Sequence, residues 1–122
     1  MIEAEMNTVP MTVVETPIFL RKAADLHDEE GRSQLALFVA ANPEAGEVIP
    51  ETGGVRKLRW AVRGRGKRGG VRVIYYFRND SFPLFLLTLF AKNQKANLTR
   101  AERNELKKLV PLLVTTYGKS RR

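Results

Sequence analysis

The chain has 122 residues, 43% of them hydrophobic, no cysteine and one histidine, and its formal net charge is +8. This composition indicates one globular domain with a modest core, and it excludes disulfide bonds, thiolate catalysis, cysteine-based zinc sites and cages of several histidines. Residues 1–10 show no periodicity, so we expect a disordered extension followed by a single domain over residues 11–122, frayed at its end. Without a membrane-spanning run or the pattern of a signal peptide, we expect a cytoplasmic protein with no membrane contact.

The first half of the domain is expected to hold one strand and two helices. A short strand is predicted within residues 11–17, where Pro17 would end it. Residues 18–42 have helical spacing, and Asp28 is the expected N-cap of the second helix. The apolar positions of that helix are Leu35, Phe38 and Val39. Residues 44–54 are predicted to be a loop.

The second half is expected to hold three strands and a final helix. Apolar and polar residues alternate over residues 55–62 and 71–77, whereas residues 84–92 are apolar on both faces, as in a covered strand. Thr99 and Glu102 form the capping-box pattern of a helix start. The expected buried stripe of this helix is Leu106, Leu109, Val110, Leu113 and Val114.

The order of these elements, β-α-α-β-β-β-α, predicts a small α+β fold. We expect a mainly antiparallel sheet of about four strands with the helices packed on one face. Because proline removes a backbone donor, Pro111 should kink or break the last helix near residues 107–111.

The excess positive charge is confined to one segment. Between Thr52 and Asn79 there are nine lysines and arginines and no acidic residue, while the rest of the chain has 12 basic against 13 acidic residues. A solvated surface loop, or charges that protect an edge strand from aggregation, would be the ordinary explanation. A one-sided concentration of cations favours a polyanion partner, most commonly nucleic acid.

Strand periodicity predicts where these cations lie. If the helices cover the face that carries Leu58 and Trp60, three cations share the opposite, open face. They are Lys57, Arg59 and Arg72. Tyr76 is in phase with Arg72 and is a candidate for stacking on a base. The candidate RNA-binding residues are Arg56, Arg63, Arg65, Lys67, Arg68 and Tyr76.

Two stretches together resemble a known family. The run GEVIPETGGVRKLRWAVRGRGKRGGVRVIYYF, followed by LFLLTLFAKNQKANLTRAERNELKKL, resembles the RelE/HigB-like toxins of bacterial type II toxin–antitoxin systems, and among them the HigB2-like branch. The resemblance covers residues 11–115. It implies a RelE-like fold and a ribosome-dependent mRNA endonuclease that uses no cofactor or metal. It also implies a cognate antitoxin, HigA-like with a helix-turn-helix domain, through which the toxin would reach operator DNA.

The resemblance also implies a catalytic set. Lys57 and Arg59 match the family's basic strand residues, Arg72 matches the arginine at the start of the next strand, and Lys92 and Asn93 stand where the last strand ends. Arginine binds phosphate with paired donors, and a lysine among other cations has a lowered pKa suited to proton transfer. Asparagine cannot move a proton, so acid–base work would fall on a lysine, a tyrosine or the ribosome.

Two other functions fit the same residues. A non-catalytic RNA-binding module would use the same surface without titratable lysines. A related toxin that poisons gyrase would need a binding surface for protein and no RNA-cutting cluster.

Overall fold

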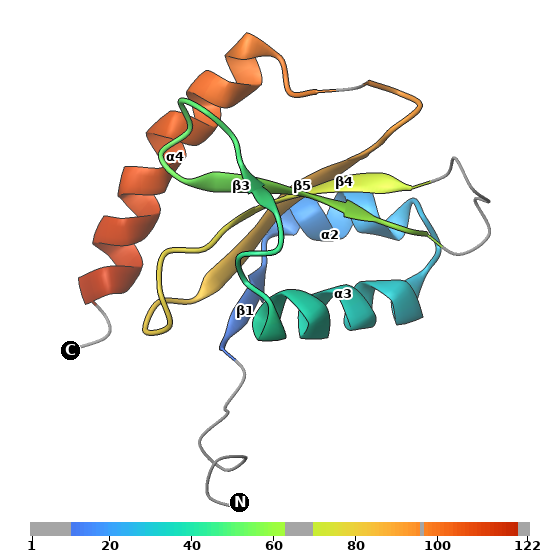
Figure 1. Ribbon diagram of the computed structural model, residues 1–122, viewed down its shortest axis with the longest axis horizontal. Coiled ribbons are helices and arrows are strands. Elements are labelled where there is room, and N and C mark those ends of the chain that lie inside the picture. The colour runs from blue at the N-terminus through green and yellow to red at the C-terminus, as the bar shows by residue number, and fades with distance from the viewer. Residues whose placement is uncertain (1–10, 63–69, 96, 120–122) are drawn as a thin grey trace, which may run out of the picture.

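The computed structural model describes residues 11–62, 70–95 and 97–119, and its centre is a five-stranded sheet (Figure 1). The strands are β1 (Val13–Glu15), β2 (Glu47–Val48), β3 (Val55–Trp60), β4 (Val71–Tyr76) and β5 (Leu84–Ala91). Their order across the sheet is β1-β5-β4-β3-β2, with antiparallel neighbours except for the parallel pair β1–β5. The α+β class and the mainly antiparallel sheet are confirmed, with one more strand than expected.

The additional strand, β2, lies within the predicted loop. Its two residues pair with β3 at the edge of the sheet. The loop before it is fixed by the hydroxyl of Tyr75, which donates to the Pro43 carbonyl and accepts from the Gly46 N–H, each at 2.8 Å. A Cβ at Gly46 would stand 2.9 Å from the Tyr75 ring, so glycine is needed for this close approach. Burial raises the pKa of Tyr75, which keeps its hydroxyl protonated as a donor.

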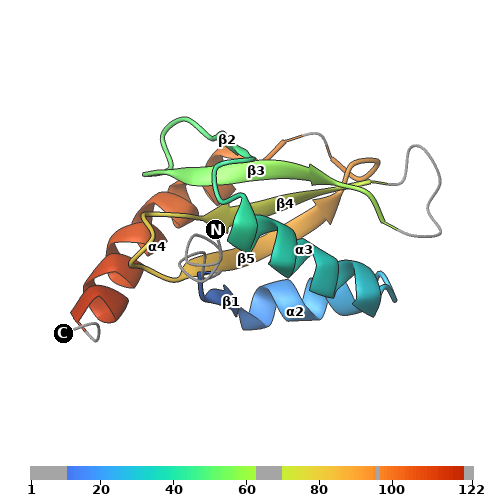
Figure 2. The same ribbon diagram turned by 60° about the horizontal axis from the view of Figure 1, so that its bottom comes forward.

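Two helices, α2 (Pro17–Ala24) and α3 (Glu29–Ala41), cover one face of the sheet (Figure 2). Pro17 starts α2, where its missing N–H costs nothing, and does not merely end the strand before it. Asp28 is the N-cap of α3, as predicted, and its side chain accepts from the Gly31 N–H at 3.0 Å.

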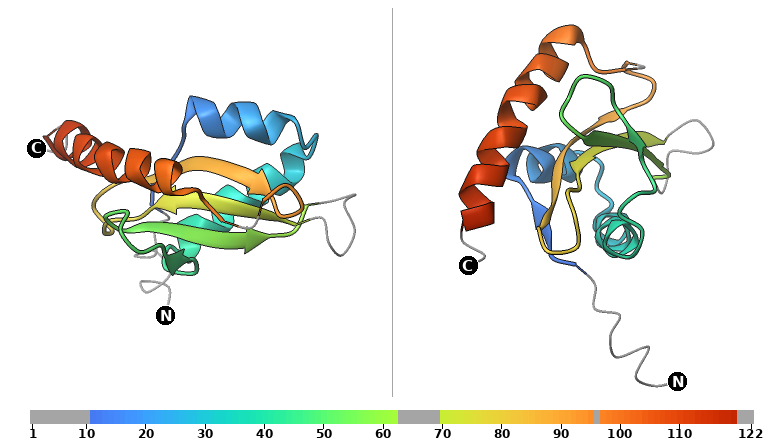
Figure 3. Two further views of the ribbon diagram at one scale, coloured as in Figure 1. Left: turned by 90° about the horizontal axis from the view of Figure 1, so that it is seen from above. Right: turned by 60° about the vertical axis from the view of Figure 1, so that its left-hand side comes forward.

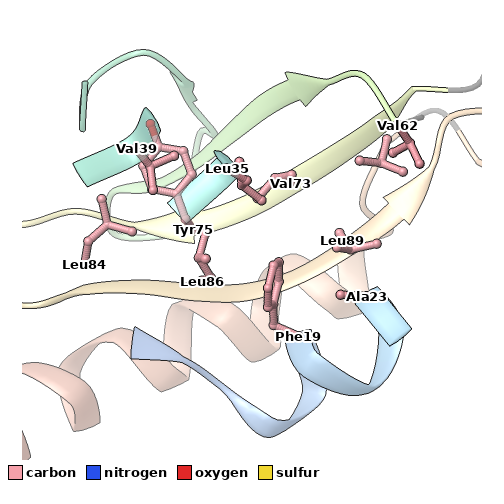
Figure 4. Packing of buried hydrophobic residues seen from close by; sticks show 11 residues of the cluster. Phe19, Ala23, Leu35, Val39, Val62, Val73, Tyr75, Leu84, Leu86 and Leu89 are labelled. Atoms are coloured by element: carbon pink, nitrogen blue, oxygen red, sulfur yellow. The ribbon is translucent and has the colours of Figure 1, made fainter. Parts of the chain in front are cut away.

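The core on this face joins both helices to the sheet (Figure 4). Phe19 from α2, Val39 from α3 and Val73 from β4 are fully buried within it. Of the three apolar positions predicted for α3, Leu35 and Val39 are buried, whereas Phe38 is 37% exposed. Phe38 packs on Trp60 with 5.5 Å between ring centroids.

The third helix, α4 (Arg100–Lys119), lies on the opposite face, so the prediction that all helices share one face is wrong (Figure 3). Its buried Val110 and its partly buried Leu106 and Leu113 pack against a second core. The physical reason is that β4 and β5 carry apolar residues on both sides, and each side must be covered.

The start of α4 has the predicted capping box. The Thr99 N–H donates to Glu102 Oε1 at 2.8 Å, and the Glu102 N–H donates to Thr99 Oγ1 at 3.1 Å. The helix continues through Pro111 to Lys119, so the expected break is absent. In the part of the chain that the structure describes, no helix is long and apolar enough to cross a membrane.

Candidate functional site

The second core occupies only part of its face of the sheet. Val55 on β3 and Tyr76 on β4 lie side by side in that core, close to α4. Further along the same strands, the cross-strand register places Arg59 directly opposite Arg72 and Lys57 directly opposite Ile74. Residues two apart on a strand share a face, so the register puts three cations on the same face as Val55 and Tyr76. Helix α4 crosses only part of this face of the sheet (Figure 3).

We call Lys57, Arg59 and Arg72 the cation row. Arg59 is exposed, while Lys57 and Arg72 are partly buried. The three side chains were predicted to share one face, and the register of β3 and β4 agrees with that prediction. A stiff antiparallel pair therefore holds the row, which gives it a fixed spacing that a loop could not provide.

Two predicted RNA-binding residues are not part of this surface. Tyr76 is in phase with Arg72, as expected, but it is only 4% exposed because it lies at the end covered by the second core. Its ring packs edge-on to Phe82, with 6.2 Å between centroids. Tyr76 is therefore a core residue and cannot stack on a base.

Arg56 belongs to the other face of β3, since it is one residue away from Lys57. Its Nη1 donates to the backbone carbonyls of Gly46 at 2.7 Å and Glu44 at 3.2 Å. Arg56 thus fixes the loop before β2 and is not available to RNA beside the row. The other predicted RNA contacts, Arg63, Arg65, Lys67 and Arg68, lie outside the described residues.

Lys92 and Asn93 directly follow β5 at the open end of the sheet. Arg72 pairs with Phe90 across β4 and β5, and the Lys92 N–H donates to the Gly70 carbonyl at 3.2 Å. Both side chains are exposed. They therefore lie at the end of the sheet where the cation row is found, although no contact between them and the row is observed among the described residues.

The segment between β5 and α4 adds residues that the sequence analysis missed. Asn97 accepts a hydrogen bond from Lys57 through Oδ1, with 2.8 Å between Oδ1 and Nζ. Lys95 lies with its Nζ 5.0 Å from the centroid of the Phe90 ring and forms an ion pair with Glu102. The hydrogen bond from Lys95 lowers the pKa of Glu102. Asn97 therefore lies beside the row. The polar residues that follow β5 were the only feature of the sequence that could have indicated a contribution to the site.

A carboxylate also stands next to the row. Glu47 on β2 is the direct cross-strand partner of Lys57. Glu47 lies before the cationic segment in the sequence, and residues 44–54 were predicted to be a loop, so this pairing was not expected. The row is thus not purely cationic at its β2 end.

A hollow of about 480 Å³ lies between α2 and α3, and it shares no residue with the cation row. It is lined by residues of both charges, among them Glu29 and Arg32, and so has no concentration of cations to attract a polyanion. Among the described residues there is also no group of three histidine or acidic side chains placed to hold a metal ion. The cation row remains the better candidate site.

Fold and site together define a class: a small basic α+β domain with a two-sided core and a row of cations at the uncovered end of its sheet. The family model described as RelE toxin of RelE / RelB toxin-antitoxin system matches residues 20–120, and the chain belongs to this family. It is therefore the toxin of a toxin–antitoxin system, with a cognate antitoxin as its partner. Toxins of this family are typically endoribonucleases.

Proposed function

We propose that this toxin is an mRNA interferase that cleaves mRNA on the translating ribosome in the cytoplasm, and that the cation row, together with Lys92 and Asn93, forms its catalytic site. The observation that carries the proposal is the pairing of Arg59 with Arg72 directly across two strands. Two like charges placed opposite each other destabilise a sheet. Such a pairing is useful where an anion, here the scissile phosphate, lies between or above the two groups.

The proposed reaction needs no metal ion. The 2′-oxygen of the ribose attacks the adjacent phosphorus, the bond from phosphorus to the 5′-oxygen breaks, and a 2′,3′-cyclic phosphate and a 5′-hydroxyl result. One proton leaves the 2′-hydroxyl and one joins the 5′-oxygen, so the protons balance. Arg59 and Arg72 would bind the phosphate oxygens with paired donors and stabilise the charge that develops on them.

Proton transfer in this proposal falls to Lys57 and Lys92. A lysine can give and take a proton, whereas an arginine stays charged and an asparagine cannot titrate. Asn93 would instead orient the RNA by hydrogen bonds. Arg63, Arg65, Lys67 and Arg68 would bind neighbouring phosphates or ribosomal RNA, which adds affinity without adding sequence information.

We further propose that the antitoxin is HigA-like, with a helix-turn-helix domain, and that the toxin reaches operator DNA only through it. A gel-shift assay with the upstream DNA of the operon tests this. Toxin and antitoxin together should shift the fragment, and toxin alone should not at salt concentrations that suppress non-specific binding.

The proposed cleavage is tested by inducing the toxin without antitoxin and mapping the 5′ ends of transcripts. New ends should appear within codons of translated regions and should be absent from untranslated RNA of the same cells. Purified toxin should cleave ribosome-bound mRNA equally well in the presence of a chelator that removes transition-metal ions but leaves the magnesium that keeps ribosomes intact. Growth arrest with intact transcripts and altered DNA supercoiling would favour a gyrase poison, and RNA binding without new ends would favour a non-catalytic module.

A further inference from the structure

A second hollow lies beside the cation row. It measures about 200 Å³ and is formed by β2, the segment after it, one residue of β3, the residues before α4 and the first turn of α4. Its lining consists of Glu47, Val48, Ile49, Pro50, Lys57, Asn97, Leu98 and Arg103. Pockets for drug-sized ligands measure roughly 300–1,000 Å³, so this hollow suits one smaller group.

We propose that this hollow binds a single nucleobase of the RNA substrate, next to the phosphate held by the cation row, and that Asn97 reads the edge of that base. The inference rests on the proposed function, because it names a specificity subsite for the same reaction. It assigns a binding role to residues that lie outside the proposed catalytic set, except for Lys57, which belongs to both.

The apolar residues and the carboxylate of the lining favour a base over a phosphate. Val48, Ile49 and Leu98 give apolar surface against which a base can lie flat, and apolar surface offers nothing to a phosphate. The carboxylate of Glu47 would repel a phosphate but can accept hydrogen bonds from the amino or imino groups of a base. Mixed apolar and polar contacts of this kind are typical of sites that recognise splayed, single-stranded bases.

The polar groups of the hollow are held in place by contacts within the protein. Because Asn97 Oδ1 accepts from Lys57 Nζ at 2.8 Å, the amide is oriented. No partner of its Nδ2 is observed among the residues that the structure describes, so its donors can bind a ligand. Arg103 is fixed in a similar way, since its Nη1 donates to the Leu98 carbonyl at 3.2 Å. Groups oriented before binding lose less entropy on contact, which improves discrimination between bases.

Lys57 connects the hollow to the cation row. It lines the hollow, it is hydrogen-bonded to Asn97, and its strand neighbour two residues on is Arg59. One nucleotide could therefore place its base in the hollow while the phosphate beside it lies over the arginines. The base in the hollow would then be the one next to the cut.

The test compares cleavage patterns of the intact toxin and two variants, Asn97→Ala and Arg103→Met. All are expressed without antitoxin, and the 5′ ends are mapped across translated messages. We expect the wild type to prefer one base at a fixed position beside the cut, and each variant to reduce that preference by roughly fivefold, the factor of one hydrogen bond. Glu105→Ala, on the exposed surface of α4 and outside the hollow, should retain the wild-type pattern.

The cleavage rate and the base frequencies at the cut distinguish base recognition by Asn97 from a role in positioning Lys57 or in binding the antitoxin. If Asn97 only positions Lys57, cleavage should slow at all sites alike and the base frequencies should not change, which would overturn the proposal. Unchanged cleavage with lost neutralisation by the antitoxin would also overturn it, because the hollow would then bind a protein.

A binding measurement keeps this inference distinct from the proposed cleavage. Single-stranded trinucleotides of each base are titrated into the isotopically labelled toxin, and the side-chain amide signal of Asn97 is followed by NMR. Shifts that depend on the base, and that disappear in Arg103→Met, would support the subsite even if the wild type cleaved no mRNA. Shifts confined to other residues, or equal for all four bases, would contradict it.

Discussion

Arg59 on β3 and Arg72 on β4 are direct cross-strand partners, so two guanidinium groups project side by side from the same face of the sheet. Like charges in this arrangement cost stability, by roughly 0.2–1 kcal/mol for such a pair. The nearest paired carboxylate, Glu47, stands opposite Lys57 and not opposite either arginine. The sheet thus holds two cations together at a cost to its own stability, as expected of a site built for an anion.

Replacing one member of this pair should stabilise the fold and destroy the activity. In Arg72→Thr the repulsion disappears and a residue with good strand propensity takes its place, so the free energy of unfolding should rise by about 0.2–1 kcal/mol. Denaturant titration measures this, and mRNA cleavage in the same variant should be lost. Arg78→Thr, which removes the same charge just beyond β4, should retain cleavage. A less stable Arg72→Thr protein would make this arginine structural.

The salt dependence of RNA binding reports how many cations touch phosphate. Each phosphate contact contributes about 0.7 to the slope of log K against log salt for single-stranded nucleic acid. Arg59→Ala should therefore reduce the slope by about 0.7, measured by fluorescence anisotropy with a labelled single-stranded RNA. Arg21→Ala removes an exposed cation from α2, on the opposite side of the sheet, and should leave the slope as it is. Equal losses in the two variants would mean that RNA binds by net charge alone.

The hydroxyl of Tyr75 is expected to stabilise the edge of the sheet. In Tyr75→Phe the Gly46 N–H and the Pro43 carbonyl lose their partner, which should cost about 1–3 kcal/mol of unfolding free energy. Thermal or chemical denaturation provides the measurement. The matched control is Tyr76→Phe, because no hydrogen bond to the Tyr76 hydroxyl is observed within the described part of the chain. Equal effects in both variants would refute the role of the Tyr75 hydrogen bonds.

The start of α4 should contribute to the pH dependence of stability. The hydrogen bond from Lys95 holds the pKa of Glu102 below its ordinary value of about 4.3, so the ionised carboxylate favours the folded state. This contribution is fully present above the ordinary pKa and is lost as the pH falls through the lowered pKa of the folded state. Melting curves of Glu102→Gln should therefore lie below those of the wild type at pH 7 and converge with them in acid.

Glu105→Gln provides the control for this pH effect, because it removes an exposed carboxylate one turn further along α4. Its melting temperature should stay close to that of the wild type throughout the range. A gap between wild type and Glu102→Gln that persists unchanged at low pH would show that the pair of Lys95 and Glu102 is not the cause.

Local chemistry made much of the fold predictable. The caps at Asp28 and Thr99, and the strands predicted within residues 55–62 and 71–77, follow from short-range patterns that the structure confirms. The phase of β4 was also correct, since Arg72 and Tyr76 do share a face. Periodicity, however, gives the face of a residue and not which end of that face is covered, and this is why Tyr76 was expected at the surface.

The placement of α4 was missed even though its signal was present. Residues 84–92 are apolar on both sides, which requires a cover on each side of the sheet. The alternating pattern of β3 suggested that one face of the sheet is open. That face is open only at the end that carries the cation row. A helix that covers only part of a face satisfies both observations.

Contacts between distant segments could not be predicted from the sequence. The hydrogen bond between Lys57 and Asn97 joins residues 40 positions apart, and the pairing of Glu47 with Lys57 depends on a strand of two residues. Neither contact produces a periodic pattern in the sequence. These contacts depend on how the sheet edge and the start of α4 meet, so they require coordinates.

The central claim is that Arg59 and Arg72 act together on the phosphate of mRNA, and the most direct measurement is single-turnover cleavage of ribosome-bound mRNA by the wild type, Arg59→Ala, Arg72→Ala and the double variant. Groups that act as a unit are strongly non-additive, so we predict that the double variant is about as slow as either single variant. Independent losses that multiply in the double variant, or near wild-type rates in either single variant with the fold intact, would contradict the account.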